Sequence, residues 1–285
     1  MVLALLVLCL LCACATPVAQ PETEPTEVTT EPTEASAEPE TEAPTEPPVP
    51  DTARELIRNG EYQAALELLA TVQEDEEVAF LKLRAELGDV AVGDQVILGS
   101  YEQDNVQDNG PEEILWVVLA VEENKALLLS LRCLDTQPYH DVIDGNITWA
   151  DSSLRQWLNE DFLMEAFSET EQLLLEETEL STPDNPFYLT PGGENTMDRV
   201  FLLDREEAHE YLTGELKRAK VTDYAYAKGC YRNGSHNGWW WLRSPGIYSR
   251  DAMYLDANGE LSVYGYVVHR AGWAVRPAVW IDLGV

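Results

Sequence analysis

Residues 239–246 read WWWLRSPG, and residues 274–281 read AVRPAVWI. Both stretches are short runs rich in aromatic and β-branched residues, a composition typical of strands. Residues 252–255 and 260–264 lie between them, and the Asn-Gly pair at 258–259 predicts a hairpin turn that joins these two segments. We therefore expect a twisted antiparallel sheet near the C-terminal end of the chain.

The chain upstream of this sheet mixes strand and helix patterns. Three runs predict strands: 94–98, 115–121 and 125–131. Residues 149–167 predict a helix with an apolar stripe, and Asp151, Ser152 or Ser153 could cap it. Residues 168–171 read SETE and predict a capping box at the start of a further helical turn. All eight tryptophans fall between Trp116 and Trp280. We expect the main core to lie within residues 89–285, in an α+β domain.

Residues 51–88 carry apolar side chains at helical spacing, with a break at the Asn-Gly pair 59–60. The stretch LIRNGEYQAALELL, at 56–69, resembles one helical hairpin of a tetratricopeptide repeat. A single repeat of this kind cannot bury its own apolar face. We expect a helical collar packed on the next domain rather than a peptide-binding array.

Residues 1–14 read MVLALLVLCLLCAC. The run is shorter than the roughly 20 apolar residues that span a membrane, and it fits the apolar core of an export signal. A small residue followed by Cys14 is typical of a bacterial lipoprotein signal. We expect cleavage before Cys14, attachment of acyl chains such as palmitate, and an anchor in the cell membrane on its extracytoplasmic face. An ordinary signal cut elsewhere, or a plain membrane anchor, is the alternative.

Residues 15–50 are rich in Pro, Glu and Thr, and positions 21–50 hold nine Glu and no Lys or Arg. Such a segment buries too little apolar surface to offset the entropy of ordering it. We expect a disordered linker that acts as a spacer between the membrane and the folded part.

The net charge of −34 argues against nucleic acid as a partner. Nucleic-acid binding requires a positive stripe, and the acidic chain offers none. Cys133 and Cys230 are the two cysteines of the folded part, and they could form one disulfide or remain reduced and buried. The four histidines show no metal-ligand spacing, so no metal site is predicted from them.

Calcium is the one cofactor for which the sequence offers weak candidates. Residues 104–110 read DNVQDNG and place oxygen ligands at alternating positions. Asp251, Asp256 and Asn258 form a second group of side chains with oxygen ligands. Ordinary turns explain both groups equally well.

Four blocks occur in a recognisable order: ILGSYEQDN at 97–105, SLRQWLN at 153–159, then WWWLRSPG and AVRPAVWI. Together they resemble a domain of unknown function common in bacterial surface proteins, over about residues 90–283. The arrangement is also similar, at the level of the fold, to C-type-lectin-like domains. These occur in formylglycine-generating enzymes and in the target proteins of diversity-generating retroelements. In those targets the ligand-binding residues precede a terminal V-R-P, which here corresponds to residues 247–273.

The similarity to formylglycine-generating enzymes does not predict enzyme activity for this chain. Formylglycine-generating enzymes use a close cysteine pair near the C-terminal end of the domain, whereas Cys133 and Cys230 are almost a hundred residues apart. The sequence also lacks the GxSxG and HExxH motifs of hydrolases. We therefore predict no catalytic residues.

Residues 247–273 gather aromatic and basic side chains in an otherwise acidic chain. Strand alternation places Tyr264 and Tyr266 on one face, opposite Val263 and Val267. Aromatic rings and Arg anchor protein partners, and Trp or Tyr faces stack on sugars. The predicted ligand-binding residues are Tyr248, Arg250, Tyr254, Tyr264, Tyr266, His269, Arg270 and Trp273.

These observations favour an extracellular, lipid-anchored binding module for a protein or glycan ligand. One alternative is a structural or accessory envelope protein without a ligand of its own. An enzyme with an unrecognised site is the third hypothesis.

Overall fold

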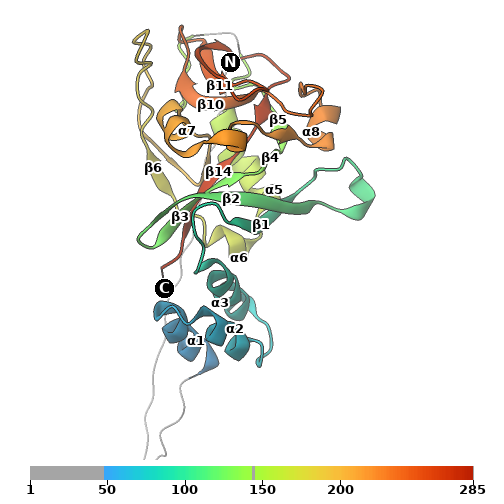
Figure 1. The fold of residues 1–285 in the computed structure, drawn as a ribbon, viewed down its shortest axis with the longest axis vertical. Coiled ribbons are helices and arrows are strands. Elements are labelled where there is room, and N and C mark those ends of the chain that lie inside the picture. The colour runs from blue at the N-terminus through green and yellow to red at the C-terminus, as the bar shows by residue number, and fades with distance from the viewer. Residues whose placement is uncertain (1–47, 143–144, 285) are drawn as a thin grey trace, which may run out of the picture. The chain divides into compact units, whose positions relative to one another are not determined.

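The computed structural model describes residues 48–142 and 145–284, shown in Figure 1. Every described residue belongs to one compact unit, Glu46–Val285. The predicted signal, the lipidation site Cys14 and nearly all of the predicted linker lie outside the described residues. No helix within the described ranges has the length and apolar character needed to cross a bilayer.

Three helices open the described part: α1 (Val49–Arg58), α2 (Tyr62–Leu69) and α3 (Glu76–Leu87). Helix α1 overlaps the last two residues of the predicted linker, and α1 and α2 are separated at the expected Asn-Gly pair. Asp75 caps α3, since its carboxylate accepts a hydrogen bond from the Val78 amide at 2.9 Å. The helices share a small core of their own that includes Ile57, Leu69 and Leu81.

Arg84 joins α3 to the mixed domain. Its guanidinium lies 2.6 Å from the Asp282 carboxylate and 5.2 Å from the centre of the Phe80 ring. Phe80 packs against both the small helical core and the large core. The helical segment therefore packs on the domain that follows it.

The first sheet has five antiparallel strands in the order β1-β2-β3-β14-β8. Their bounds are β1 (Gln95–Tyr101), β2 (Glu112–Glu122), β3 (Lys125–Ser130), β14 (Ala278–Asp282) and β8 (Val200–Phe201). The three predicted upstream strands correspond to β1, β2 and β3. The late strand β14 pairs with both β3 and β8, with Trp280 opposite Leu127.

The second sheet has the order β12-β11-β10-β13-β5. Its strands are β12 (Leu261–Val267), β11 (Asp251–Leu255), β10 (Trp240–Pro245), β13 (Ala274–Val275) and β5 (Asp135–Thr136). The expected hairpin is β11–β12, which is antiparallel. The sheet is antiparallel, as expected, at three of its four strand pairings, but β10 pairs with β13 in parallel. This pairing arises because β13 returns to β10 from the end of β12 by way of residues 268–273.

Two short ribbons complete the strands. They are β4 (Arg132–Cys133) with β9 (Lys220–Val221), and β6 (Thr178–Leu180) with β7 (Thr196–Asp198). The remaining helices and helical turns are η1 (Gln107–Asn109), α4 (Ser153–Trp157), η2 (Leu158–Phe162), α5 (Leu163–Ala166), α6 (Glu169–Gln172), α7 (Arg205–Tyr211), η3 (Gly214–Lys217) and α8 (Asp223–Ala227). With 29% helix and 29% strand, the α+β class is confirmed.

The predicted helix at 149–167 is observed as the continuous run α4-η2-α5. Ser152 is its cap, accepting a hydrogen bond from the Arg155 amide at 3.1 Å. Ser168 and Glu171 form the reciprocal hydrogen bonds of a capping box at the start of α6, as the local sequence predicts. These local signals therefore identify both helix starts.

A buried hydrogen bond joins the two sheets. The Tyr101 hydroxyl, on β1, donates to the Asp135 carboxylate, on β5, at 2.6 Å. Lys228 completes the network, with its ammonium 2.7 Å from the same carboxylate. Asp135 is fully buried, so these two partners supply the charge and the donor that its burial requires.

Arg243 and Arg276, from the blocks WWWLRSPG and AVRPAVWI, are both buried but have different partners. Burial lowers the pKa of Arg243, but Glu207 and Asp204, at 2.5 Å and 3.0 Å, raise it by more. Arg276 donates instead to the carbonyls of Ser130 and Leu216 and lies over the Trp240 ring. Burial lowers the pKa of Arg276 to about 10.

Candidate functional site

One face of the β11–β12 hairpin carries exposed tyrosines. Tyr264 is 59% exposed and Tyr266 is 42% exposed, while Val263 packs against the large core. Gly265 between the tyrosines has φ +72°, and a Cβ there would lie 2.6 Å from the Ala252 carbonyl oxygen. The tight approach of β12 to β11 at this glycine fixes the backbone from which both rings project.

A row of rings in tilted contact, which we call the aromatic ladder, lies along this face: Tyr231, Trp239, Trp273 and Tyr266. Successive ring centres are 4.8, 5.0 and 5.2 Å apart. Tyr254 lies beside the ladder, with its ring centre 4.3 Å from that of Trp273. The end rings are exposed, since Tyr231 is 46% exposed, whereas Trp273 is only 3% exposed.

The burial of Trp273 changes the role we assign to it. Its ring also stacks on Trp241 at 4.6 Å, so it packs between the outer rings and the core. An aromatic ring enclosed in this way stabilises its neighbours rather than offering a free face. Trp273 therefore positions Tyr266 and Tyr254.

A second pair of rings extends the face beyond the ladder. Tyr188 is in the loop that links β6 to β7, and its ring centre lies 5.7 Å from that of Tyr264. Asn185 holds this loop, because its buried side-chain amide donates to the carbonyls of Pro245, Gly246 and Val263 at 3.0–3.1 Å. The loop tip exposes Phe187 and Leu189 next to Tyr188.

The predicted basic residues lie at the rim of this face. The guanidinium of Arg250 is 5.4 Å from the centre of the Tyr248 ring, and both side chains are exposed. They line an open cavity of about 520 Å³ together with Asn146, Thr190 and Ser249. Backbone contacts bring the end of β12 alongside, since the Val268 amide donates to the Arg250 carbonyl at 2.9 Å. Beyond this contact, His269 is half-buried and Arg270 is exposed.

Sequence reasoning missed three members of this surface: Tyr188, Tyr231 and Trp239. They lie outside residues 247–273, and no local spacing connects them to the hairpin. The pairing of β10 with β11 places Trp239, and the docking of the 182–194 loop places Tyr188. The amide of Tyr231 donates to the Gly272 carbonyl at 2.9 Å, next to Trp273. Trp239 belongs to the run of three tryptophans at 239–241 that the sequence analysis noted, but the sequence did not show which of these rings faces outward.

The two cysteines are buried and carry free thiols in this structure. Burial raises the pKa of Cys230 to about 12 and raises that of Cys133 further above its ordinary value. Neither thiol is therefore suited to be a nucleophile near neutral pH. A disulfide between them stays a prediction.

Of the first calcium candidate, residues 104–110, Asp104 lies in a carboxylate cluster with Glu102 and Glu112 in the described part of the chain, and Asp108 does not. Glu112 accepts hydrogen bonds from the amides of Gln103 and Asp104, at 2.6 Å and 3.2 Å. Asp104 accepts one from the Val106 amide at 2.7 Å. These carboxylates stabilise their own loop, and calcium binding there stays a prediction.

At the second candidate, Asp256 accepts hydrogen bonds from the amides of Asn258 and Glu260 at 2.8 Å and 2.9 Å. These contacts close the β11–β12 turn. Asp251 is nearly buried at the other end of β11, away from that turn. The three residues are therefore not brought together into one ligand set.

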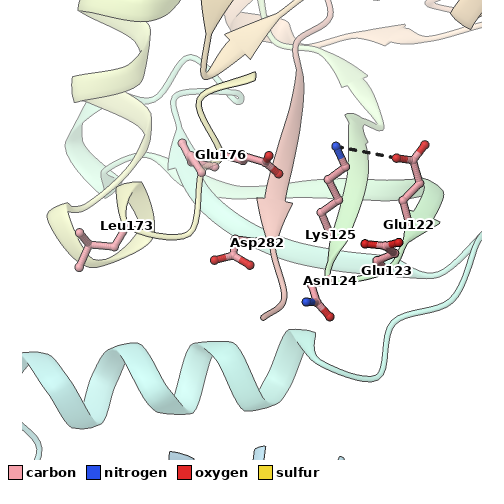
Figure 2. A pocket seen from close by; sticks show the side chains of 8 residues that line it. Glu122, Glu123, Asn124, Lys125, Leu173, Glu176 and Asp282 are labelled. Carbon is pink, nitrogen blue, oxygen red and sulfur yellow. Dashed lines mark ion pairs between the residues drawn. The ribbon is translucent and has the colours of Figure 1, made fainter. Parts of the chain in front are cut away.

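A larger cavity, of about 970 Å³, opens elsewhere in the domain (Figure 2). It is lined by the β2–β3 turn, the stretch after α6 and the end of β14: Glu122, Glu123, Asn124, Lys125, Leu173, Leu175, Glu176 and Asp282. Lys125 lies 3.8 Å from Glu122 and over the Trp280 ring. The predicted binding residues do not line this cavity.

Comparison with known families places the C-terminal part of the chain. A family model described as "Domain of unknown function (DUF6273)" matches residues 123–283, more than half of the chain. The chain belongs to this family. The resemblance to an uncharacterised domain is thereby confirmed in its coarser form, although the ILGSYEQDN block lies before the matched residues. The DUF6273 region contains the whole second sheet and the predicted binding residues. No curated protein and no solved structure matched the chain.

Proposed function

We propose that this chain is an extracellular, lipid-anchored binding module whose aromatic face takes a protein or glycan ligand. The observation that carries the proposal is the exposure of Tyr264 and Tyr266 on a rigid backbone, in front of the buried Trp273. Folded monomers usually cover such a group of large apolar side chains unless it meets a partner. Rings that are already held in place lose little entropy on binding.

The order of elements supports a C-type-lectin-like arrangement for the mixed domain. The helix α4-η2-α5 is followed by β8 running into α7, then by the Trp-rich β10, the β11–β12 hairpin and the closing strand β14. The α1–α2 hairpin supports a single repeat like those of tetratricopeptide proteins. Cys14 and the acidic segment 15–47 supply an anchor and a spacer in this proposal.

Binding of the full chain to a glycan array and to purified envelope proteins tests the function. We expect Tyr266→Ala to weaken binding at least tenfold, as for a residue at the centre of an interface. Met164→Ala is the matched control, because Met164 is exposed on α5, away from the aromatic ladder. Equal binding by both variants would place the ligand elsewhere, and no binding by the native chain would favour an accessory envelope protein.

Mass spectrometry of the mature N-terminus tests the anchor separately. We expect a lipid-modified Cys14 as the first residue of protein extracted from membranes. An unmodified peptide that begins at another residue would exclude lipidation at Cys14, without bearing on the aromatic face.

A further inference from the structure

We propose that the ligand of the aromatic face is an acidic glycan, a chain of sugar rings that carry carboxylates. The inference rests on the proposed function for the face itself. It narrows a protein or glycan ligand to one chemical class, because exposed tyrosines, exposed arginines and an open polar cavity meet at the β11–β12 hairpin.

The exposed rings of this region are amphipathic. Within residues 247–273, the large apolar or aromatic side chains that are exposed are all tyrosines: Tyr248, Tyr264 and Tyr266. The aliphatic side chains of β12 are half-buried. A tyrosine offers an apolar ring face with a hydroxyl at its tip, and a sugar ring offers an apolar C–H face with hydroxyls around it. Tyr264 and Tyr266 present two such faces in a row, which suits a chain of several sugar rings.

Two arginines lie at the end of β12 that carries Tyr266. The Val268 amide donates to the Arg250 carbonyl at 2.9 Å, and the Arg270 amide donates to the Val267 carbonyl at 3.1 Å. Both arginine side chains are exposed. In the described part of the chain, neither guanidinium forms an ion pair. Each can therefore offer its planar set of donors to a carboxylate of a ligand.

The carboxylates of the hairpin turn do not reach the arginine end. Asp256 and Glu260 precede β12, so at about 3.4 Å per residue the strand separates them from Val267 by roughly 20 Å. Charges so far apart are screened at physiological salt, where the Debye length is about 8 Å. Asp251, next to Arg250, is nearly buried. The acidic turn therefore opposes an anionic ligand only weakly at the arginines.

The open cavity of about 520 Å³ adjoins the same strand, and Asn146, Ile247, Ser249 and Arg250 are among the residues that line it. The Ile247 amide donates to the Tyr264 carbonyl at 2.8 Å, so the cavity wall is bonded to β12 at an exposed tyrosine. The volume lies within the range of about 300–1,000 Å³ that is common for small-ligand sites. Amide and hydroxyl groups in its wall can exchange hydrogen bonds with sugar hydroxyls. The cavity therefore offers a place for a sugar unit beside the exposed rings.

Matched oligosaccharides test the proposal by isothermal titration calorimetry on the purified full chain. Oligomers of galacturonate, mannuronate and glucuronate are compared with their methyl esters, which keep the sugar rings and remove the charge. We expect at least one acid to bind about tenfold or more tightly than its ester, and this preference to shrink in about 0.5 M salt. Equal binding of acids and esters would overturn the inference and leave a glycan ligand, and so the proposed function, in place.

Substitutions test whether the two arginines cause the preference. Arg250→Gln and Arg270→Gln should each lower the ratio of acid to ester affinity at least about threefold, with ester affinity unchanged within about twofold. Arg58→Gln is the matched control, because it removes the same charge from an exposed position at the end of α1. Tyr264→Ala should weaken acid and ester alike, since a ring face does not distinguish them. An unchanged ratio in both arginine variants would overturn the inference.

Poly-glutamate, titrated in the same way, separates an acidic protein from an acidic glycan. If poly-glutamate binds through the arginines and none of the oligosaccharides binds, the inference fails and the proposed function stands. If neither class binds here, the inference also fails. The proposed function fails with it only when the glycan array and the envelope proteins give no binding either.

Discussion

In the first sheet the large aromatic side chains Trp116 and Phe201 are completely buried, whereas in the second sheet Tyr264 and Tyr266 stand in solvent. The two sheets share one core and are joined by the hydrogen bond between Tyr101 and Asp135. They differ in how the outer face is used. The second sheet buries the rings of Trp240 and Trp241 as completely as the first sheet buries its own, but it also keeps two tyrosine rings outside the core.

Burial of a large apolar side chain contributes about 1.5–3 kcal/mol to folding, and an exposed ring contributes little. The exposed tyrosines are therefore maintained at almost no gain in stability. Substitutions in the first sheet should then affect folding, and substitutions on the aromatic face should affect binding. The following substitutions test whether folding and binding depend on different residues in this way.

Trp116→Ala should have the largest effect. The substitution removes a fully buried ring and its hydrogen bond to the Leu98 carbonyl, at 2.7 Å. We expect a loss of about 3–5 kcal/mol in the free energy of unfolding. Urea denaturation followed by circular dichroism measures it. A loss below about 1 kcal/mol would show that the first sheet is not the stabilising one.

Arg243→Met should come next, with a loss of about 3–5 kcal/mol at pH 7, because it leaves the carboxylates of Asp204 and Glu207 without their cation. Arg276→Met is the matched control, since Arg276 contacts carbonyls and a ring instead. Its loss should be smaller, about 1–3 kcal/mol. Urea denaturation of both variants measures the two losses, and equal losses would contradict this account.

Tyr266→Ala should change the free energy of unfolding by no more than about 0.5–1 kcal/mol, because the ring is exposed. It should also uncover Trp273, whose ring centre lies 5.2 Å away, and shift the tryptophan emission to the red. Thermal unfolding and fluorescence spectra of the same sample check both effects. A large destabilisation would mean that the aromatic face belongs to the core after all.

Glu165→Gln should have the smallest effect, at the junction of the two sheets. Burial, and then the charge of Asp135, raise the pKa of Glu165, although Lys228 opposes them. A raised carboxyl pKa means that the folded state binds the proton more tightly than the unfolded state does. The stability from this group is present below its ordinary pKa of 4.5 and is lost as the pH rises through the raised value.

The glutamine variant has no such loss. We expect it to match the native chain at pH 4 and to exceed it at pH 7 by a few tenths of a kcal/mol, since the side chain is largely exposed. Unfolding curves at the two pH values measure the difference. The raised pKa of Glu165 would be contradicted if the stability of the variant relative to the native chain were lower at pH 7 than at pH 4.

Local sequence signals predicted the local parts of this structure. The capping residues Ser152 and Ser168, and the Asn-Gly hairpin at 258–259, act over a few residues, so their spacing is sufficient to recognise them. The alternation of Tyr264 with Val263 follows from the geometry of any strand.

The pairing of strands that lie far apart along the chain could not be predicted from the sequence. The parallel pairing of β10 with β13 depends on where residues 268–273 return the chain, and no periodicity encodes that. The same holds for Tyr231 and Tyr188, which reach the aromatic face from distant segments. The burial of Trp273 is also a property of its four ring neighbours, and its own position in the sequence looks like that of an exposed residue.

The position of β14 has a consequence for synthesis. Residues 278–282 lie inside the first sheet, with β3 on one side and β8 on the other. A nascent chain that lacks these residues has two open strand edges facing each other, so it cannot complete the hydrogen bonding of that sheet. Contacts between residues so far apart along the chain also make folding slow. The first sheet therefore stays incomplete until residues 278–282 have been synthesised and have left the ribosome.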